Sequence, residues 1–137
     1  MNTKIINKKL LFMNFIFAFA ILIQGCSNNE VENMSIEYVN KISNGDDTYI
    51  ELLTNDKRLG SSKKVIEILI DKWRNDVQNK GGLKSLSVNK TKFSEDGNTA
   101  EVTLDLEYGN KTQGSYTVDL EKEDNRWKVS FLFYLNN

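Results

Sequence analysis

Histidine and proline are absent from this sequence of 137 residues, and cysteine occurs once, at Cys26. Without histidine, the Ser-His-Asp and Cys-His arrangements of nucleophilic enzymes cannot form. A single cysteine cannot make an internal disulfide, so the fold must be held by packing. Zinc and copper sites use Cys and His ligands, so neither a transition metal nor another cofactor is expected. Without proline, the turns must be made by Gly, Asn, Asp and Ser.

An excess of basic charge is also missing. All 19 Asp and Glu residues lie beyond the first 25 positions, which hold three of the 18 Lys and Arg residues. Without those three, 15 basic residues stand against 19 acidic ones, a net charge near −4. Nucleic-acid binding needs a basic surface that releases counterions, so nucleic acid is not an expected partner.

The first 25 residues have the parts of a secretory leader. Three lysines form a positive start, and residues 10–23 form an apolar stretch that is broken only by Asn14. A membrane-spanning helix needs about 20 apolar residues, so this stretch is too short to span a membrane. The sequence therefore predicts a signal peptide over residues 1–25.

The leader ends in Ile23-Gln24-Gly25-Cys26. This motif resembles the lipobox of bacterial lipoproteins, although Gln24 stands where a small or apolar residue is usual. In that motif the cysteine thiolate takes up a diacylglyceryl group, and a small residue before it lets the peptidase cut. An ordinary secretory leader would not require a cysteine here. We therefore expect lipid on Cys26.

Lipid on Cys26 predicts both the location and the organisation of the mature chain. Stable anchoring takes more than one acyl chain, and the lipoprotein modification supplies at least two. We expect a lipidated tether over residues 26–33 and one domain over residues 34–137. That domain would face the extracytoplasmic side of the cell membrane or the outer membrane.

Helical periodicity dominates the first half of the domain. Residues 33–44 predict a short amphipathic helix that ends at Gly45, and Asp46 or Asp47 predicts the cap of a second short helix. A longer helix should follow, from a cap at Ser61 or Ser62 to Gly81-Gly82. Its apolar residues recur at helical spacing and form a broad stripe, which should lie across a sheet: Val65, Ile66, Ile68, Leu69, Ile70, Trp73 and Val77.

Strand periodicity dominates the second half. Residues 83–93 predict a first strand, and Gly97 lies in a hairpin turn over residues 94–98. From Thr99 to Tyr108 apolar and polar residues alternate strictly, which predicts one dry and one wet face. A third strand and a fourth follow after the turns at 109–114 and 123–125. In the fourth, one apolar face is predicted to hold Trp127, Val129, Phe131, Phe133 and Leu135.

The order of these elements resembles a family of small bacterial lipoproteins of unknown function. The similar stretches are residues 81–86, 94–102 and 121–129, within a likeness that covers most of residues 31–134. The domain of that family belongs to the nuclear transport factor 2-like, cystatin-like fold. The resemblance therefore implies an α+β fold in which a long helix packs on a curved antiparallel sheet of about four strands, often with a cavity between them.

Such a cavity leads to a first hypothesis for function, a non-catalytic binding module for a small apolar ligand. Six aromatic residues are candidates for its lining: Tyr38, Trp73, Tyr108, Tyr116, Trp127 and Phe131. Aromatic residues at core spacing are also ordinary core residues, so a filled interior is the alternative.

Two other functions are compatible with this fold, catalysis and protein interaction. Enzymes on this fold can work with Tyr and Asp, but they need a carboxylate inside the apolar cavity. Here the acidic residues of the clearly alternating strands fall on the outward face, and those of the long helix fall on its polar side. Only acidic residues in loops, such as Asp56, are not placed by this pattern. We therefore predict no enzyme. The remaining function is protein interaction, as an immunity, inhibitor or assembly accessory protein, through acidic loops suited to a basic envelope protein.

Overall fold

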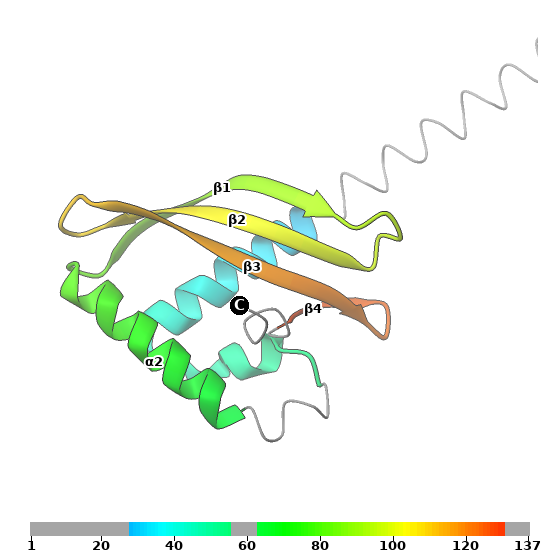
Figure 1. The fold of residues 1–137 in the computed structure, drawn as a ribbon, viewed down its shortest axis with the longest axis horizontal. Coiled ribbons are helices and arrows are strands. Elements are labelled where there is room, and N and C mark those ends of the chain that lie inside the picture. Colours follow the sequence, from blue (N-terminus) through cyan, green and yellow to red (C-terminus); the bar gives the residue numbers. More distant parts are fainter. Residues whose placement is uncertain (1–27, 56–62, 131–137) are drawn as a thin grey trace, which may run out of the picture. The chain divides into compact units, whose positions relative to one another are not determined.

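The computed structural model describes residues 28–55 and 63–130. They form the expected α+β fold, in which helices pack on one face of a four-stranded antiparallel sheet (Figure 1). The leader, Cys26, both predicted caps at Ser61 and Ser62, and Phe131 lie outside the described residues. Within the described ranges, no helix is both long and apolar enough to cross a membrane.

The first helix runs over residues 28–44, so it starts earlier and is longer than the short helix expected over 33–44. Val31, Tyr38, Val39 and Ile42 are each 1% exposed or less, which makes this helix the most deeply buried one. The compact unit of the chain begins at Val31. The residues predicted as a tether, 26–33, therefore include a core residue of the domain.

A short 3-10 helix, η1 (Asp47–Leu52), follows the turn at Gly45. Its N-cap is Asp46, one of the two predicted caps, whose carboxylate accepts a hydrogen bond from the Thr48 amide at 2.9 Å. Tyr49 of η1 is buried, and its ring meets Tyr38 of the first helix edge to face at 6.3 Å between centroids. This short helix thus adds to the core beside the first helix.

The second long helix is α2 (Lys63–Asn79), which ends just before the predicted stop at Gly81-Gly82, where both glycines have positive φ. Only part of its broad apolar stripe is covered. Ile66, Ile70 and Val77 are buried, whereas Val65, Ile68 and Leu69 are 45%, 58% and 45% exposed. The helix with the strongest sequence pattern is therefore the less buried of the two long helices.

The strands lie in chain order across the sheet. They are β1 (Leu83–Phe93), β2 (Thr99–Tyr108), β3 (Gln113–Glu123) and β4 (Arg126–Val129). Two register shifts interrupt the pairing of β1 with β2, at Lys84 and Asn89. The second shift lets both Val88 and Thr91 lie on the inner phase, because the extra residue Asn89 reverses the alternation of the strand.

The core lies between the helices and the inner face of the sheet. The inner phase of β2 supplies the largest share of it, and all five residues are at most 5% exposed: Ala100, Val102, Leu104, Leu106 and Tyr108. Strict alternation in β2 thus predicted its dry face correctly. Figure 1 shows none of the described helices on the opposite face of the sheet, which we call the outer face.

Two glycines join the end of α2 to the β2–β3 turn. The Gly109 amide donates to the Gly82 carbonyl at 2.9 Å, and the Asn110 amide donates to the Lys80 carbonyl at 2.8 Å. A Cβ atom on Gly109 would lie 2.2 Å from the Gly81 carbonyl oxygen. Only glycine permits this approach, so the contact positions the C-terminal end of α2 against the sheet.

Candidate functional site

The aromatic residues predicted to line a pocket divide into two groups. Tyr38, Tyr108 and Trp127 are at most 4% exposed and belong to the hydrophobic core. The Trp127 ring meets Phe93 edge to face at 5.8 Å between centroids, and the Lys122 ammonium lies 5.0 Å from its centroid. These three side chains come from the first helix, β2 and β4, so the fold brings them into one core.

Trp73 and Tyr116 form the second group and are only partly buried. Their rings meet edge to face at 5.0 Å between centroids, so α2 touches β3 at this point. Phe131, the sixth candidate, lies outside the described residues. The ligand pocket between α2 and the sheet stays a prediction.

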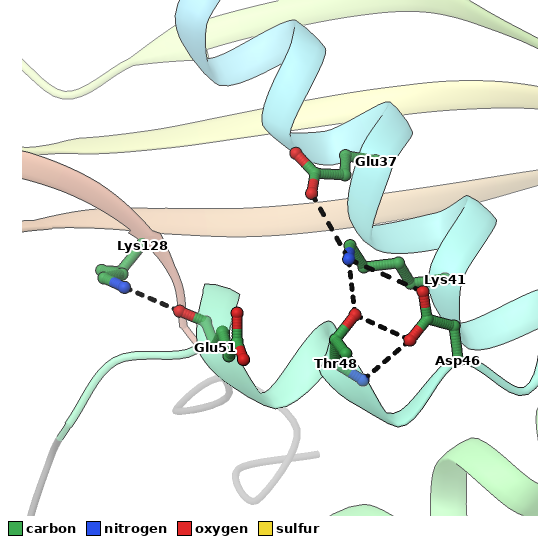
Figure 2. Close-up of polar contacts among 6 residues, drawn as sticks. All are labelled: Glu37, Lys41, Asp46, Thr48, Glu51 and Lys128. Carbon is green, nitrogen blue, oxygen red and sulfur yellow. Dashed lines mark hydrogen bonds and ion pairs between the residues drawn. The ribbon is translucent and has the colours of Figure 1, made fainter.

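A polar network joins the first helix to the start of η1 (Figure 2). The Lys41 ammonium donates to the Thr48 hydroxyl at 2.5 Å and lies 3.6 Å from carboxylate oxygens of both Glu37 and Asp46. The Thr48 hydroxyl in turn donates to Asp46 at 2.7 Å. The Thr48 hydroxyl, its backbone amide and Lys41 hold the pKa of Asp46 below its usual value.

This network does not have the geometry of an activated nucleophile. A base beside a hydroxyl must accept its proton, but Lys41 donates to Thr48. The carboxylate of Asp46 already caps η1, so its hydrogen bonds serve the backbone. The network therefore closes the turn between two helices, and sequence alone indicated only the cap.

The outer face of β2 and β3 forms the other notable polar surface. Over the residues that pair between β2 and β3, the outward phase holds five carboxylates and no basic residue. We call these five the acidic stripe: Glu101, Asp105, Glu107, Asp119 and Glu121. Basic residues lie on the flanking strands. Lys92 of β1 pairs with Glu101 at 3.1 Å, and Lys84 pairs with Glu107 at 3.0 Å.

The acidic stripe contains one directly opposed pair of like charges. Glu101 and Asp119 are cross-strand neighbours in the β2–β3 register. Partial burial, and then the negative charge of Glu101, raise the pKa of Asp119 above its usual value. Like charges directly opposite each other destabilise a sheet, so this pair has an energetic cost in the free protein.

One end of the stripe borders an open depression of about 300 Å³ on the outer face. Its lining is mainly polar: Ser85, Ser87, Asp105, Leu106, Glu107, Gln113 and Gly114. The Asn89 side-chain amide donates to both oxygens of Asp105, at 3.0 and 2.9 Å. None of the predicted pocket residues lines this depression. The alternation of apolar and polar residues in β2 and β3 was enough to predict the acidic stripe. The sequence alone could not indicate the depression beside it.

Metal ligands do not gather in the described ranges. No group of three or more His, Cys, Asp or Glu side chains there is placed to hold a metal ion. The carboxylates of β2 and β3 lie on the outer phase, as alternation predicted, and away from the apolar core. The structure therefore shows no carboxylate of these two strands inside the apolar interior.

Comparison with solved structures identifies the fold. No family model and no curated protein matches this sequence. A Campylobacter jejuni protein, provisionally named an NTF2-like transpeptidase, superposes with a TM-score of 0.64 and 16% identity. The superposition covers 74% of this chain and 98% of that protein. The domain therefore has the NTF2-like fold that the sequence resemblance implied.

A second solved structure is similar more weakly. It is the intermembrane space region of the chloroplast protein ARC6, with a TM-score of 0.40, 18% identity, and 74% and 91% of the two chains covered. A similarity at this level bears on neither fold nor function. The first comparison, at 16% identity, bears on the fold alone.

Proposed function

We propose that this chain is a lipid-anchored protein of the bacterial cell envelope whose NTF2-like domain is a non-catalytic, protein-binding module. One observation carries the choice of partner: the acidic stripe of β2 and β3 keeps Glu101 and Asp119 opposed on a face that none of the described helices covers. A partner that presents Lys or Arg side chains to this pair would offset the repulsion between the two carboxylates.

The leader and the start of the fold support a position at the membrane surface. Cys26 precedes the first core residue, Val31, by five positions. A fully extended chain of this length spans at most about 17 Å. A domain held by lipid on Cys26 would therefore work close to the lipid headgroups, and its partner would lie at the same membrane.

Several features support a binding role over catalysis. The transpeptidase name belongs to a protein that is 16% identical, and acyl transfer requires a nucleophile with an adjacent base. The single cysteine of this chain lies in the lipobox-like motif, where lipid would occupy its sulfur. The Thr48 hydroxyl is hydrogen-bonded to the Lys41 ammonium and to the Asp46 carboxylate that caps η1. This arrangement is not that of a nucleophile beside its general base.

Fractionation of cells that express the full chain tests the anchor. We expect the wild-type protein in the membrane fraction, with lipid detected by mass spectrometry on an N-terminal Cys26. The Cys26→Ala variant should lose the lipid, whereas the neighbouring Ser27→Ala variant should keep it. Unmodified wild-type protein, or lipid on the Cys26→Ala variant, would show that the anchor proposal is wrong.

Site-specific photo-crosslinking in the same cells tests the binding face. A photoreactive residue at Thr103, in the middle of the stripe, should capture a partner, whereas one at the exposed Ile68 of α2 should not. Replacing Glu101 by Gln and Asp119 by Asn should abolish the Thr103 adduct. Capture that survives this double substitution, or capture at Ile68 alone, would contradict a role for the stripe.

A second function, binding of a small apolar ligand, is favoured by the partly buried ring pair of Trp73 and Tyr116. Such a ligand would contact both rings between α2 and β3. A titration with an apolar fluorescent dye tests this function. A bound dye should quench tryptophan fluorescence in the wild-type protein and in Trp127→Phe, but not in Trp73→Phe. Equal quenching in all three proteins would argue against this site.

A further inference from the structure

The compact unit of the chain, which begins at Val31, starts beside one end of the sheet. Glu32 of the first helix accepts a hydrogen bond from the Thr91 hydroxyl of β1 at 2.7 Å. Thr91 is two residues from Phe93, the last residue of β1. Figure 1 shows the first helix running away from this end of β1. We call this end, formed by Phe93 and the turns at 94–98 and 124–125, the hairpin end of the sheet.

The hairpin end is the part of the sheet that lies nearest to Cys26 along the chain. Glu32 follows Cys26 by six positions, which span at most about 21 Å even when the chain is fully extended. Strand β1 has 11 residues and is about 33 Å long. If Cys26 carries lipid, the hairpin end must therefore stay near the headgroups, whereas the opposite end of the sheet can stand clear of them.

An exposed aromatic side chain lies at the hairpin end. Phe93 is 36% exposed, and among the described strands it is the one large apolar residue exposed to this degree. Its ring packs on the buried Trp127, and the ammonium of the exposed Lys122 lies 5.0 Å from the Trp127 centroid. Aromatic and lysine side chains occur together where proteins lie in the interfacial layer of a membrane, because the ring is apolar and the ammonium reaches water.

Other faces of the domain are less suited to contact with lipid. The carboxylates of the acidic stripe would be repelled by anionic headgroups, so the outer face should turn away from them. Helix α2 joins the first helix at Ile42, which is ten residues, or about 15 Å of helix, beyond Glu32. At the hairpin end, by contrast, exposed charges of both signs are mixed: Lys90, Glu95, Asp96, Lys122, Asp124 and Arg126.

We propose that the hairpin end is the membrane-facing surface of the domain and that Phe93 contacts the lipid headgroup layer. This inference rests on the lipid anchor of the proposed function and adds the orientation of the anchored domain. Ser85, which lines the open depression, is six residues, or about 20 Å, from Thr91 along β1. The depression is then held away from the headgroups, where a protein partner can reach it.

Fluorescence quenching in vesicles tests this orientation. Lipid occupies the Cys26 sulfur in the mature protein, so Glu95→Cys or Gln113→Cys supplies a single free thiol for a fluorophore. These two exposed positions lie at opposite ends of the sheet. The lipidated protein is reconstituted in vesicles of phosphatidylethanolamine and phosphatidylglycerol that contain a lipid with a nitroxide on its headgroup. The probe at position 95 should be quenched at least about threefold more than the probe at position 113, because the two ends are about 30 Å apart.

The outcomes separate this inference from the anchor itself. Equal quenching at the two positions, or stronger quenching at position 113, would overturn the proposed orientation. Mass spectrometry of the same sample shows whether Cys26 carries lipid. Absence of lipid would overturn both the anchor and the orientation, whereas lipid together with equal quenching would overturn the orientation alone.

A matched pair of substitutions tests the contact made by Phe93. Phe93→Ala should reduce the quenching at position 95 at least about twofold, because it removes the apolar side chain that enters the headgroup layer. Ile68→Ala removes a more exposed apolar side chain of α2, 58% against 36%, and should leave the quenching unchanged. Equal effects of the two substitutions would contradict a contact through Phe93. Should Phe93→Ala unfold the domain, the two probe positions in the otherwise unchanged chain still decide the orientation.

Discussion

The two long helices of this domain differ in a way that their sequences do not suggest. The first helix buries Val31, Tyr38, Val39 and Ile42 almost completely, although its sequence predicted only a short amphipathic segment. The apolar stripe of α2 is the broader of the two, yet three of its residues are 45–58% exposed. The contrast shows that helical periodicity predicts a face, whereas the neighbouring elements determine how much of that face is covered.

The largest expected effect on stability is seen when one isoleucine from each long helix is replaced by alanine. Ile42→Ala should lower the free energy of unfolding by about 3–4 kcal/mol, because it leaves a cavity where the side chain is fully buried. Ile68→Ala should change it by less than about 0.5 kcal/mol, because the side chain is 58% exposed. Urea denaturation followed by circular dichroism measures both. Similar losses in the two variants would remove the distinction between the helices.

The attachment of α2 at its C-terminal end comes next. Gly109→Ala should cost about 3 kcal/mol, because the new Cβ would lie 2.2 Å from the Gly81 carbonyl oxygen and force the two segments apart. Gly97→Ala is the control, since it meets no neighbouring atom and bears only the strain of its positive φ, about 1 kcal/mol. The melting temperatures of the two variants give the comparison. A Gly109→Ala protein as stable as Gly97→Ala would mean that α2 does not depend on this junction.

The contact between the two helices should have a smaller effect. Arg74→Ala removes the hydrogen bond from Nε to the Ile42 carbonyl and should cost about 1.5 kcal/mol, because this carbonyl then loses a charged donor. Lys72→Ala, on the exposed side of α2, should stay within about 0.5 kcal/mol of the wild type. Chemical denaturation of the three proteins at one salt concentration tests this order. No difference between the variants would contradict a stabilising role for the Arg74 contact.

The smallest effect concerns Tyr49, which η1 places beside the first helix. Burial, and then the charge of Glu67 on α2, raise the pKa of Tyr49 above its usual value of 10.0. The folded chain then holds the phenol proton more tightly than the unfolded chain. This contribution is fully present below pH 10 and is lost as the pH rises from 10 through the folded pKa.

Tyr49→Phe removes this titration. Between pH 9 and about 11 the free energy of unfolding should therefore fall less in the variant than in the wild type. The difference between the two proteins at pH 7 serves as the reference, because it measures the effect of removing the hydroxyl itself. Absorbance at an ultraviolet wavelength specific for tyrosinate should show that the variant lacks one late-titrating tyrosine of the wild type. If the free energy of unfolding depended on pH in the same way in the two proteins, the Tyr49 phenol would have the same pKa in the folded and the unfolded chain.

Local patterns were sufficient to predict most elements of the fold. Strict alternation predicted β2 and its dry face, Gly81-Gly82 marked the end of α2, and Asp46 was one of two predicted caps of η1. These features depend on residues close in sequence, through side-chain period, positive φ and capping. The bulge at Asn89 was missed, because a register shift depends on the partner strand and β1 alone does not reveal it.

The candidate site was predicted less completely. Sequence placed Tyr38, Tyr108 and Trp127 on apolar phases, but only the fold shows that they are core residues at most 4% exposed. The acidic stripe was visible as an outward phase of β2 and β3. The opposition of Glu101 and Asp119 required the register between the two strands. Cross-strand neighbours come from different parts of the chain, so the repulsion between their charges can be recognised only in the tertiary structure.

The sequence by itself determined the kinds of elements, their order, and which phase of each strand is apolar, because these follow from periodicity and turn chemistry over a few residues. It also contains the pattern that predicts a secretory leader, and the lipobox-like motif at Cys26. Only the tertiary structure decided that the first helix is the more buried one and that Val65, Ile68 and Leu69 of α2 are partly exposed. Burial depends on which surfaces meet, and those contacts form between residues far apart in the chain.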